Sequence, residues 1–387
     1  MAKDGSKLGL GFAGQLRLNV ANQGRDEGTR VGDGPRETET TVELRRVRLY
    51  LRGSFLDDRI RTLVQFSLSP SSPELVDLWG EYALNPAARL RIGQQKLPFT
   101  RHRGQSFTLL PMVEWDIAAV AFGAERQIGF QLHDGMRGDG HVNYSLGIFS
   151  GVNARSAFAK GMADTYGESL PNRSSFRSSP LPTTLHPELA GLLGYSSRGM
   201  DATAVTDLEG GGLRSFVAIS GTWDAKPELG QDFLARLSPE VLLKYRHLSC
   251  NLVGFGSMFE ATDGRDRVGL LGATLEATYR FDARFELAAR YSRVDTPRRL
   301  RADARTRAAR AIAAAAPAEQ ADLQDQYANA GMILAREEIG IGFNVYIIGR
   351  SLAWQSDVEL IRTGKVASAD VRQDDLVRAR SQLQLAF

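Results

Sequence analysis

The residues best suited to chemistry in this sequence are arginines that recur at every second position. Arg46, Arg48 and Arg52 all lie at even-numbered positions of one segment, and Arg59 and Arg61 both lie at odd-numbered positions of the next. Arginine stays charged at neutral pH and binds carboxylate or phosphate through a planar fork. In a water-filled passage, such a row would raise the local concentration of anions while each contact stays weak. The pattern indicates anion attraction rather than a covalent reaction.

Nine cationic residues form the candidate set for attracting anions, and four carboxylates could neutralise them. The cations are Arg46, Arg48, Arg52, Arg59, Arg61, Arg91, Lys96, Arg101 and Arg103, and the carboxylates are Asp77, Glu81, Glu114 and Asp116. Two interpretations stay open: either these cations face a passage and guide anions, or the carboxylates neutralise them and the arginine row stiffens a wall. Arg101 and Arg103 are the first candidates for conduction.

Signals for catalysis are weak. The five histidines lack the spacing of a metal site, and the single Cys250 has no cysteine partner. The sequence contains no Gly-x-Ser-x-Gly elbow and no phosphate-binding loop. A hydrolase with a His and Ser pair near a lipid boundary stays open as a minor alternative. We therefore expect no catalytic residues, no metal and no cofactor.

The arginines lie on segments in which apolar and polar residues alternate strictly. Val47, Leu49 and Leu51 oppose the first arginine row, and Val64 and Phe66 oppose the second. Such alternation predicts strands with one apolar and one wet face. The whole chain gives sixteen such strands, near residues 8–20, 40–55, 59–68, 74–85, 89–97, 126–132, 141–151, 188–198, 213–223, 239–247, 249–261, 268–281, 285–294, 337–347, 351–362 and 375–387.

The connections between these strands alternate in length. The long ones are 21–40, 98–125, 152–187, 224–238, 295–336 and 363–374, and the tight ones include 56–58, 86–88, 247–249, 282–284 and 348–350. Bacterial outer-membrane barrels have this asymmetry, with short periplasmic turns and long outer loops. The pattern predicts an all-β fold, a single transmembrane antiparallel barrel of about sixteen strands over residues 1–387. Gly199 to Gly212 is an exception, because it is too long for a tight turn.

Composition agrees with this architecture without requiring it. Hydrophobic residues make up 43% and charged residues 24% of the chain, and no stretch approaches eighteen consecutive apolar residues. A helical membrane protein is excluded, whereas a barrel needs only every second residue to face lipid. The net charge of +3 is too small to indicate nucleic acid. The sequence starts without an export signal, so an exported barrel would have had its signal removed.

Two further segments are informative. Residues 301–316 are rich in alanine and arginine and predict a helical excursion of the seventh outer loop, with a second helix from Pro317. At the other end, Leu383, Leu385 and Phe387 share one strand face. This ending resembles the signal read by the bacterial barrel-assembly machinery, and an aromatic at a strand end suits the bilayer interface.

The stretch from Leu44 to Gly151 resembles the phosphate-selective porin O and P family. The resemblance rests on 45–53, 77–82, 89–99, 125–129 and 144–151, which match in order and spacing. It implies a homotrimeric sixteen-stranded channel whose third outer loop, here 98–125, folds inward and narrows the pore. Where the best-studied members cluster lysines, this chain has Lys96, Arg101, His102 and Arg103.

The sequence therefore predicts an integral protein of the bacterial outer membrane, in contact with its lipid and lipopolysaccharide. We expect passive diffusion of small hydrophilic solutes through it, with a bias toward phosphate or other small anions. Two alternatives stay open. The chain could be a structural barrel, plugged by its loops and anchoring a partner through residues 295–336. It could also be a soluble all-β binding protein.

Overall fold

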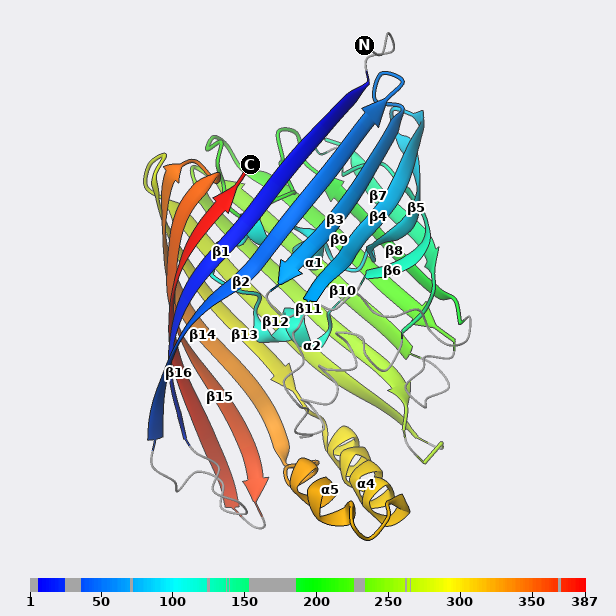
Figure 1. Cartoon of the computed structure of the whole chain (residues 1–387), viewed down its shortest axis with the longest axis vertical. Coiled ribbons are helices and arrows are strands. Elements are labelled where there is room, and N and C mark those ends of the chain that lie inside the picture. The colour runs from blue at the N-terminus through cyan, green and yellow to red at the C-terminus, as the bar shows by residue number, and fades with distance from the viewer. Residues whose placement is uncertain are drawn as a thin grey trace.

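Sixteen antiparallel strands form a closed barrel in the computed structural model of the chain (Figure 1). Each strand pairs with its sequence neighbours, and β1 pairs with β16. The strand number and the antiparallel arrangement are as predicted. The structure describes residues 6–24, 36–69, 72–123, 126–136, 138, 140–152, 186–225, 234–261, 263–264, 266–367 and 370–387.

The strands are between eight and twenty residues long. Their bounds are β1 Lys7–Gly24, β2 Arg36–Phe55, β3 Ile60–Ser69, β4 Ser72–Asn85, β5 Ala88–Lys96, β6 Arg126–His133, β7 Val142–Phe149, β8 Glu188–Ser196, β9 Arg214–Asp224, β10 Leu234–Tyr245, β11 Leu248–Glu260, β12 Arg267–Arg280, β13 Phe285–Asp295, β14 Ile333–Ile348, β15 Leu352–Ala367 and β16 Asp370–Ala386.

The two faces of the barrel wall differ in chemistry. Large apolar side chains point outward and are exposed, as at Leu193 and Ile341, where 57% and 65% of the residue surface is accessible. Polar and charged side chains point inward and are buried, as at Glu276 and Ser292. This distribution is the reverse of that in a soluble globular protein and is typical of barrels whose outer surface contacts lipid. No helix in the described part of the chain is long and apolar enough to cross a membrane.

The two ends of the barrel also differ. Strand β1 starts and β16 finishes at the end that carries the tight turns, at the top of Figure 1. The turn after β2 is made by three consecutive residues with positive φ, Leu56, Asp57 and Asp58. Aspartate tolerates this left-handed conformation better than most residues. The turns predicted after β4, β10, β12 and β14 are also present.

The terminal phenylalanine closes the barrel seam. The backbone N–H of Phe12 donates to the carbonyl of Phe387 at 2.8 Å, and the N–H of Phe387 donates back at 2.9 Å. Their rings stack with centroids 5.6 Å apart. Leu383 and Leu385 lie on the outer face of β16, 46% and 44% exposed. The alternating ending thus completes the last strand pair.

One predicted long connection, 363–374, is wrong. Strand β15 continues to Ala367 and β16 begins at Asp370, with polar pairs such as Lys365 opposite Arg372. Strand pairing requires only backbone groups, so it continues where both faces are polar and no alternation marks it. Strand β10 also begins earlier than predicted, at Leu234 instead of residue 239.

Two helices follow β13, as the sequence predicts. They are α4 (Arg298–Ala314) and α5 (Gln320–Gln326), and both lie at the end opposite the tight turns (Figure 1). Leu300 and Ala304 of α4 are buried in the same apolar cluster as Phe259 and Leu270 of the barrel wall. The excursion is therefore packed onto the mouth of the barrel rather than extended into solvent.

Candidate functional site

The connection between β5 and β6 lies inside the barrel, and its described residues 97–123 are called the inner loop below. It contains α1 (Arg101–Gly104), the 3-10 turn η1 (Phe107–Leu109) and α2 (Ile117–Ala121). Wall amides satisfy its backbone: Asn344 donates to the carbonyl of Pro111 at 2.8 Å, and Gln355 donates to that of Leu110 at 2.9 Å. A buried loop needs such partners, because unpaired carbonyl groups away from water are costly.

Asp116 is the main anchor of the inner loop. Its carboxylate caps α2 by accepting from the N–H of Ala119 at 2.8 Å, and it accepts from Thr274 and Ser292 on the wall. Nε2 of His102 contacts its second oxygen at 2.8 Å. Burial alone would raise the pKa of Asp116, but these hydrogen bonds hold it below its usual range. The residue proposed as a counter-acid is thus buried and fully used in holding the loop.

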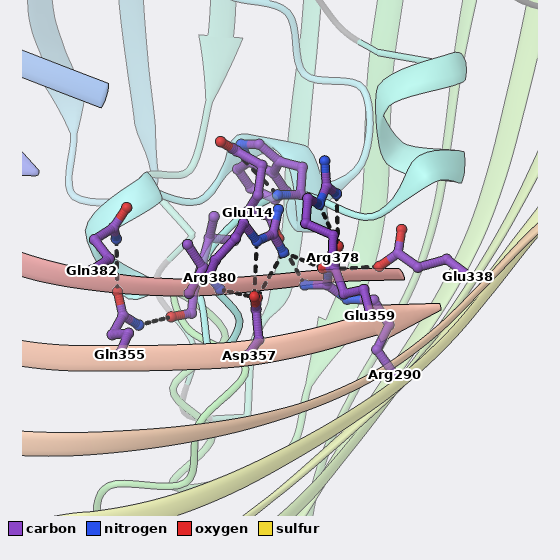
Figure 2. Close-up of polar contacts among 12 residues, drawn as sticks. Glu114, Arg290, Glu338, Gln355, Asp357, Glu359, Arg378, Arg380 and Gln382 are labelled. Atoms are coloured by element: carbon purple, nitrogen blue, oxygen red, sulfur yellow. Dashed lines mark hydrogen bonds and ion pairs between the residues drawn. The ribbon is translucent and has the colours of Figure 1, made fainter. Parts of the chain in front are cut away.

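An ion-pair network on β13 to β16 supports the loop from below (Figure 2). Arg380 lies 2.7 Å from a carboxylate oxygen of Asp357 and also pairs with Glu359. Asp357 accepts from the N–H of Val113 on the inner loop at 2.9 Å. Arg378 pairs with Glu359 at 2.6 Å. The two arginines and two carboxylates of this part of the wall are therefore paired with one another.

Arg290 on β13 is the centre of the same network. Its guanidinium lies 2.8 Å from Glu276 and 3.0 Å from Glu338, and it donates to the carbonyl of Glu114 at 2.9 Å. Glu338 in turn accepts from the N–H of Ile117 at 2.9 Å. All three charged wall side chains are buried. One arginine therefore pairs with two buried carboxylates and also holds the loop backbone.

Glu114 on the inner loop is held by three arginines. Arg17 lies 3.1 Å away, Arg45 lies 3.0 Å away, and Arg46 forms a third ion pair. Burial alone would raise the pKa of Glu114, but these cations, with Arg46 the strongest, hold it well below its usual range. Arg46 is therefore an ion-pair partner of Glu114, and the single Glu114 carboxylate is shared by three arginines.

Sequence reasoning missed Arg45. A β-bulge between β1 and β2 pairs Gln15 with Arg46 and Leu16 with Leu44, so Arg45 is the extra residue. The bulge lets two consecutive arginines reach Glu114. The sequence carries a signal for this bulge. The apolar residues of the outer face have even numbers up to Leu44 and odd numbers from Val47, so the alternation shifts by one residue between them.

Arg101 is buried and paired, so it is not available as a free pore charge. It is 5% exposed, forms an ion pair with Glu240 on β10, and donates to Asn251 at 2.8 Å. A further N–H donates to the carbonyl of Ala202 at 3.2 Å. These contacts make Arg101 a positioning residue that fixes the start of the inner loop.

Three other cations meet without a carboxylate partner among the described residues, and we name Arg48, Lys96 and Arg103 the basic cluster. Two guanidinium nitrogens of Arg48 are buried without a hydrogen-bond partner. Lys96 donates only to the loop carbonyls of Gly104 and Gln105. The Arg103 guanidinium stacks over the Trp115 ring, 4.7 Å from its centroid.

The charge of Lys96 interacts with the charges of both other members of the basic cluster. Lys96 experiences the charges of Arg48 and Arg103, together with that of Arg126 and the compensating Asp77. Arg126 is itself paired with Asp77 at 2.8 Å. Burial lowers the pKa of Arg103 to about 10, so its side chain stays cationic at neutral pH. The cluster therefore carries a net positive charge between the inner loop and β2 to β5.

The other predicted cations divide into two groups. Arg91 lies 2.6 Å from Glu81, which also pairs with Arg89 and contacts His133, so two arginines share one carboxylate. Towards the tight-turn end, Arg61 lies 3.8 Å from Asp58 and is about half exposed. Arg52 and Arg59 are exposed at the same end. The structure thus brings together only part of the predicted arginine row.

The architecture matches that of solved outer-membrane channels. The outer membrane channel DcaP of Acinetobacter baumannii has a TM-score of 0.59 and 11% identity, over 100% of this chain and 99% of that one. This chain has the fold of a porin. An anion-selective porin from Comamonas acidovorans has a TM-score of 0.57 and 12% identity, over 99% of this chain and 100% of that one. OprB of Pseudomonas putida has a TM-score of 0.54 and 10% identity, over 99% of this chain and 94% of that one.

Sequence comparisons add no closer relative. No family model matches the chain, and no curated protein sequence matches it. At 9% to 12% identity, the solved structures share the barrel fold with this chain and say nothing of its individual side chains. The resemblance to the phosphate-selective porin O and P family is not confirmed by these comparisons.

Proposed function

We propose that this protein is an outer-membrane porin that lets small hydrophilic solutes diffuse passively, with a bias toward anions. The outward apolar surface, the polar lumen and the porin fold support membrane insertion and a channel. The observation that carries the anion bias is the basic cluster. Its three cations meet beside the inner loop without a carboxylate partner in the described part of the chain.

The physical basis of the bias is the difference between paired and unpaired charge. A neutralised ion pair presents a dipole whose field falls steeply with distance, whereas an unpaired cation lowers the energy of an anion over several ångströms. The wall from β13 to β16 is almost wholly paired, as is Arg46 with Glu114. Anions should therefore pass along the side of Arg48 and Arg103.

The solute class proposed is small inorganic anions and small carboxylates. Two buried side-chain amides have no hydrogen-bond partner among the described residues: Gln95, which precedes Lys96 in the sequence, and Gln105, whose backbone carbonyl accepts from Lys96. Amide N–H groups and a cation together suit oxyanions such as phosphate, whose oxygens accept several hydrogen bonds. A separate preference for phosphate rests on the family resemblance of residues 44–151.

The membrane setting proposed follows from the ends of the barrel. The seam at Phe12 and Phe387 and the outward Leu383 and Leu385 fit recognition by the barrel-assembly machinery. Both termini would then lie in the periplasm, and α4 and α5 would face lipopolysaccharide on the outside. A homotrimer, as the family resemblance implies, and an absence of enzymatic activity complete the proposal.

A planar-bilayer recording of the purified, refolded protein tests the channel directly. We expect discrete ohmic conductance steps in potassium chloride, because the closed barrel has a polar inner wall like that of a water-filled channel. The control is the same protein unfolded by heat before addition. A folded, membrane-inserted barrel without any conductance would favour a plugged structural barrel instead.

A further inference from the structure

The connection between β8 and β9, residues 197–213, folds into the barrel from the tight-turn end, and we call it the inserted connection. Met200 and Val205 in it are buried, 3% and 0% exposed. They pack in one cluster with Phe216 of β9 and Leu242 of β10, which point into the lumen. The inserted connection therefore packs against an apolar patch on an otherwise polar inner wall, since burying these apolar side chains is favourable.

Polar contacts fix the inserted connection in place. Arg214 donates to both carboxylate oxygens of Asp207, at 2.7 and 2.8 Å, and the N–H of His247 donates to the same group at 2.9 Å. Lys244 on the lumen wall donates to the carbonyl of Asp201 at 2.7 Å. Asp207 is fully buried. A buried carboxylate with three donors holds a defined conformation.

The inserted connection meets the inner loop inside the barrel. The Arg101 guanidinium donates to the carbonyl of Ala202 and, on its other side, contacts Glu240 and Asn251 of the wall. Two segments that enter from opposite ends of the barrel are therefore joined at one buried arginine. Motion of either segment would have to break a charged hydrogen bond in a buried setting.

The space left beside this junction is a cavity of about 350 Å³. Gln105 and Ser106 line it from the inner loop, Lys96 lines it from the end of β5, and Ala202 and Thr203 line it from the inserted connection. Strands β5 to β7 complete it with Arg91, Gln131, His133 and Ser145. Thr203 is exposed, unlike its neighbours Ala202 and Ala204. A solute that has passed the basic cluster reaches this space next.

We propose that the inserted connection is a second constriction, in series with the inner loop, and that Thr203 lines the exit of the pore. This inference rests on the proposed function. It assigns size selection at the exit to residues 197–213, while charge selection stays with the basic cluster. The substrates that fit such an exit are small hydrated anions, and bulkier organic anions are retarded there.

The test uses thiol modification of the full-length protein in a planar bilayer. The natural cysteine is removed by Cys250→Ser, and a new thiol is introduced by Thr203→Cys. Addition of a negatively charged methanethiosulfonate reagent should lower the single-channel conductance by about half or more, because the adduct fills and charges the exit. The control is Gly212→Cys, since Gly212 is exposed, a Cβ there meets nothing within 4 Å, and the residue does not line the cavity.

Conductance before the reagent is added separates this inference from the proposed function. A channel that conducts, is labelled completely at Thr203→Cys by mass spectrometry and keeps its conductance would overturn the second constriction. A thiol at residue 203 that fails to react while that at residue 212 reacts would overturn it as well. A barrel with no conductance before labelling would instead contradict the proposed porin.

Discussion

The double variant Arg48→Gln with Arg103→Gln should lose most of the anion preference of the channel while keeping its fold. Neither guanidinium forms an ion pair with a carboxylate among the described residues, and the two acids whose charges act on Arg103, Asp116 and Glu114, keep their own closer partners when it is removed. In bulk water, a unit charge changes the energy of an ion about 6 Å away by on the order of 0.7 kcal/mol, so two charges correspond to roughly tenfold in local anion concentration at low salt. The measurement is the reversal potential in a potassium chloride gradient.

Arg52→Gln is the matched control for this variant. Arg52 lies on β2 on the same face as Arg48, but it is exposed near the tight turns and lies over the Tyr50 ring at 4.7 Å. Its field is screened by water and salt, so the reversal potential should change little. An equal effect of both variants would mean that the basic cluster has no special role.

Arg290→Met should destabilise the barrel by roughly 3–5 kcal/mol, because it leaves buried carboxylates without their cation. Arg290 lies within 3.0 Å of both Glu276 and Glu338, and its loss also frees the backbone of Glu114 on the inner loop (Figure 2). The measurement is the urea midpoint of the refolded protein in detergent or lipid. Noisier single-channel currents should accompany the loss of loop anchoring.

Two further variants test the reason for this loss. Arg293→Met, on the same strand, removes an arginine that pairs with Asp295 but is 42% exposed, and an exposed pair contributes little. Adding Glu276→Gln and Glu338→Gln to Arg290→Met removes the uncompensated charges and should restore much of the stability. A triple variant as unstable as Arg290→Met would show that packing, not charge, explains the effect.

The barrel itself could be predicted from the sequence because its physical cause is local. The side chains of each strand in a membrane barrel alternate between lipid and lumen, so a segment such as 60–68 can be recognised as a strand from its own residues. Strand extensions beyond the apolar band, as at residues 363–374, could not be predicted, since backbone pairing there leaves no alternation in the side chains.

The candidate site was only partly predictable. Alternation places Arg46 and Arg48 on the lumen face, and the family resemblance places Arg101 on an inward loop, but neither says which of them a carboxylate pairs with. That depends on where the inner loop carries Glu114 and on the wall strand that carries Glu240, contacts that span 68 and 139 residues of sequence. The bulge at Arg45 and the apolar patch that contacts residues 197–213 likewise depend on tertiary contacts.

The most direct test of the central claim is the sign of the reversal potential of the unmodified protein in a tenfold potassium chloride gradient at low ionic strength. The basic cluster predicts a potential displaced toward the equilibrium potential of chloride, with the displacement shrinking as salt is raised on both sides. A potential displaced toward that of potassium would contradict anion selection by Arg48, Lys96 and Arg103.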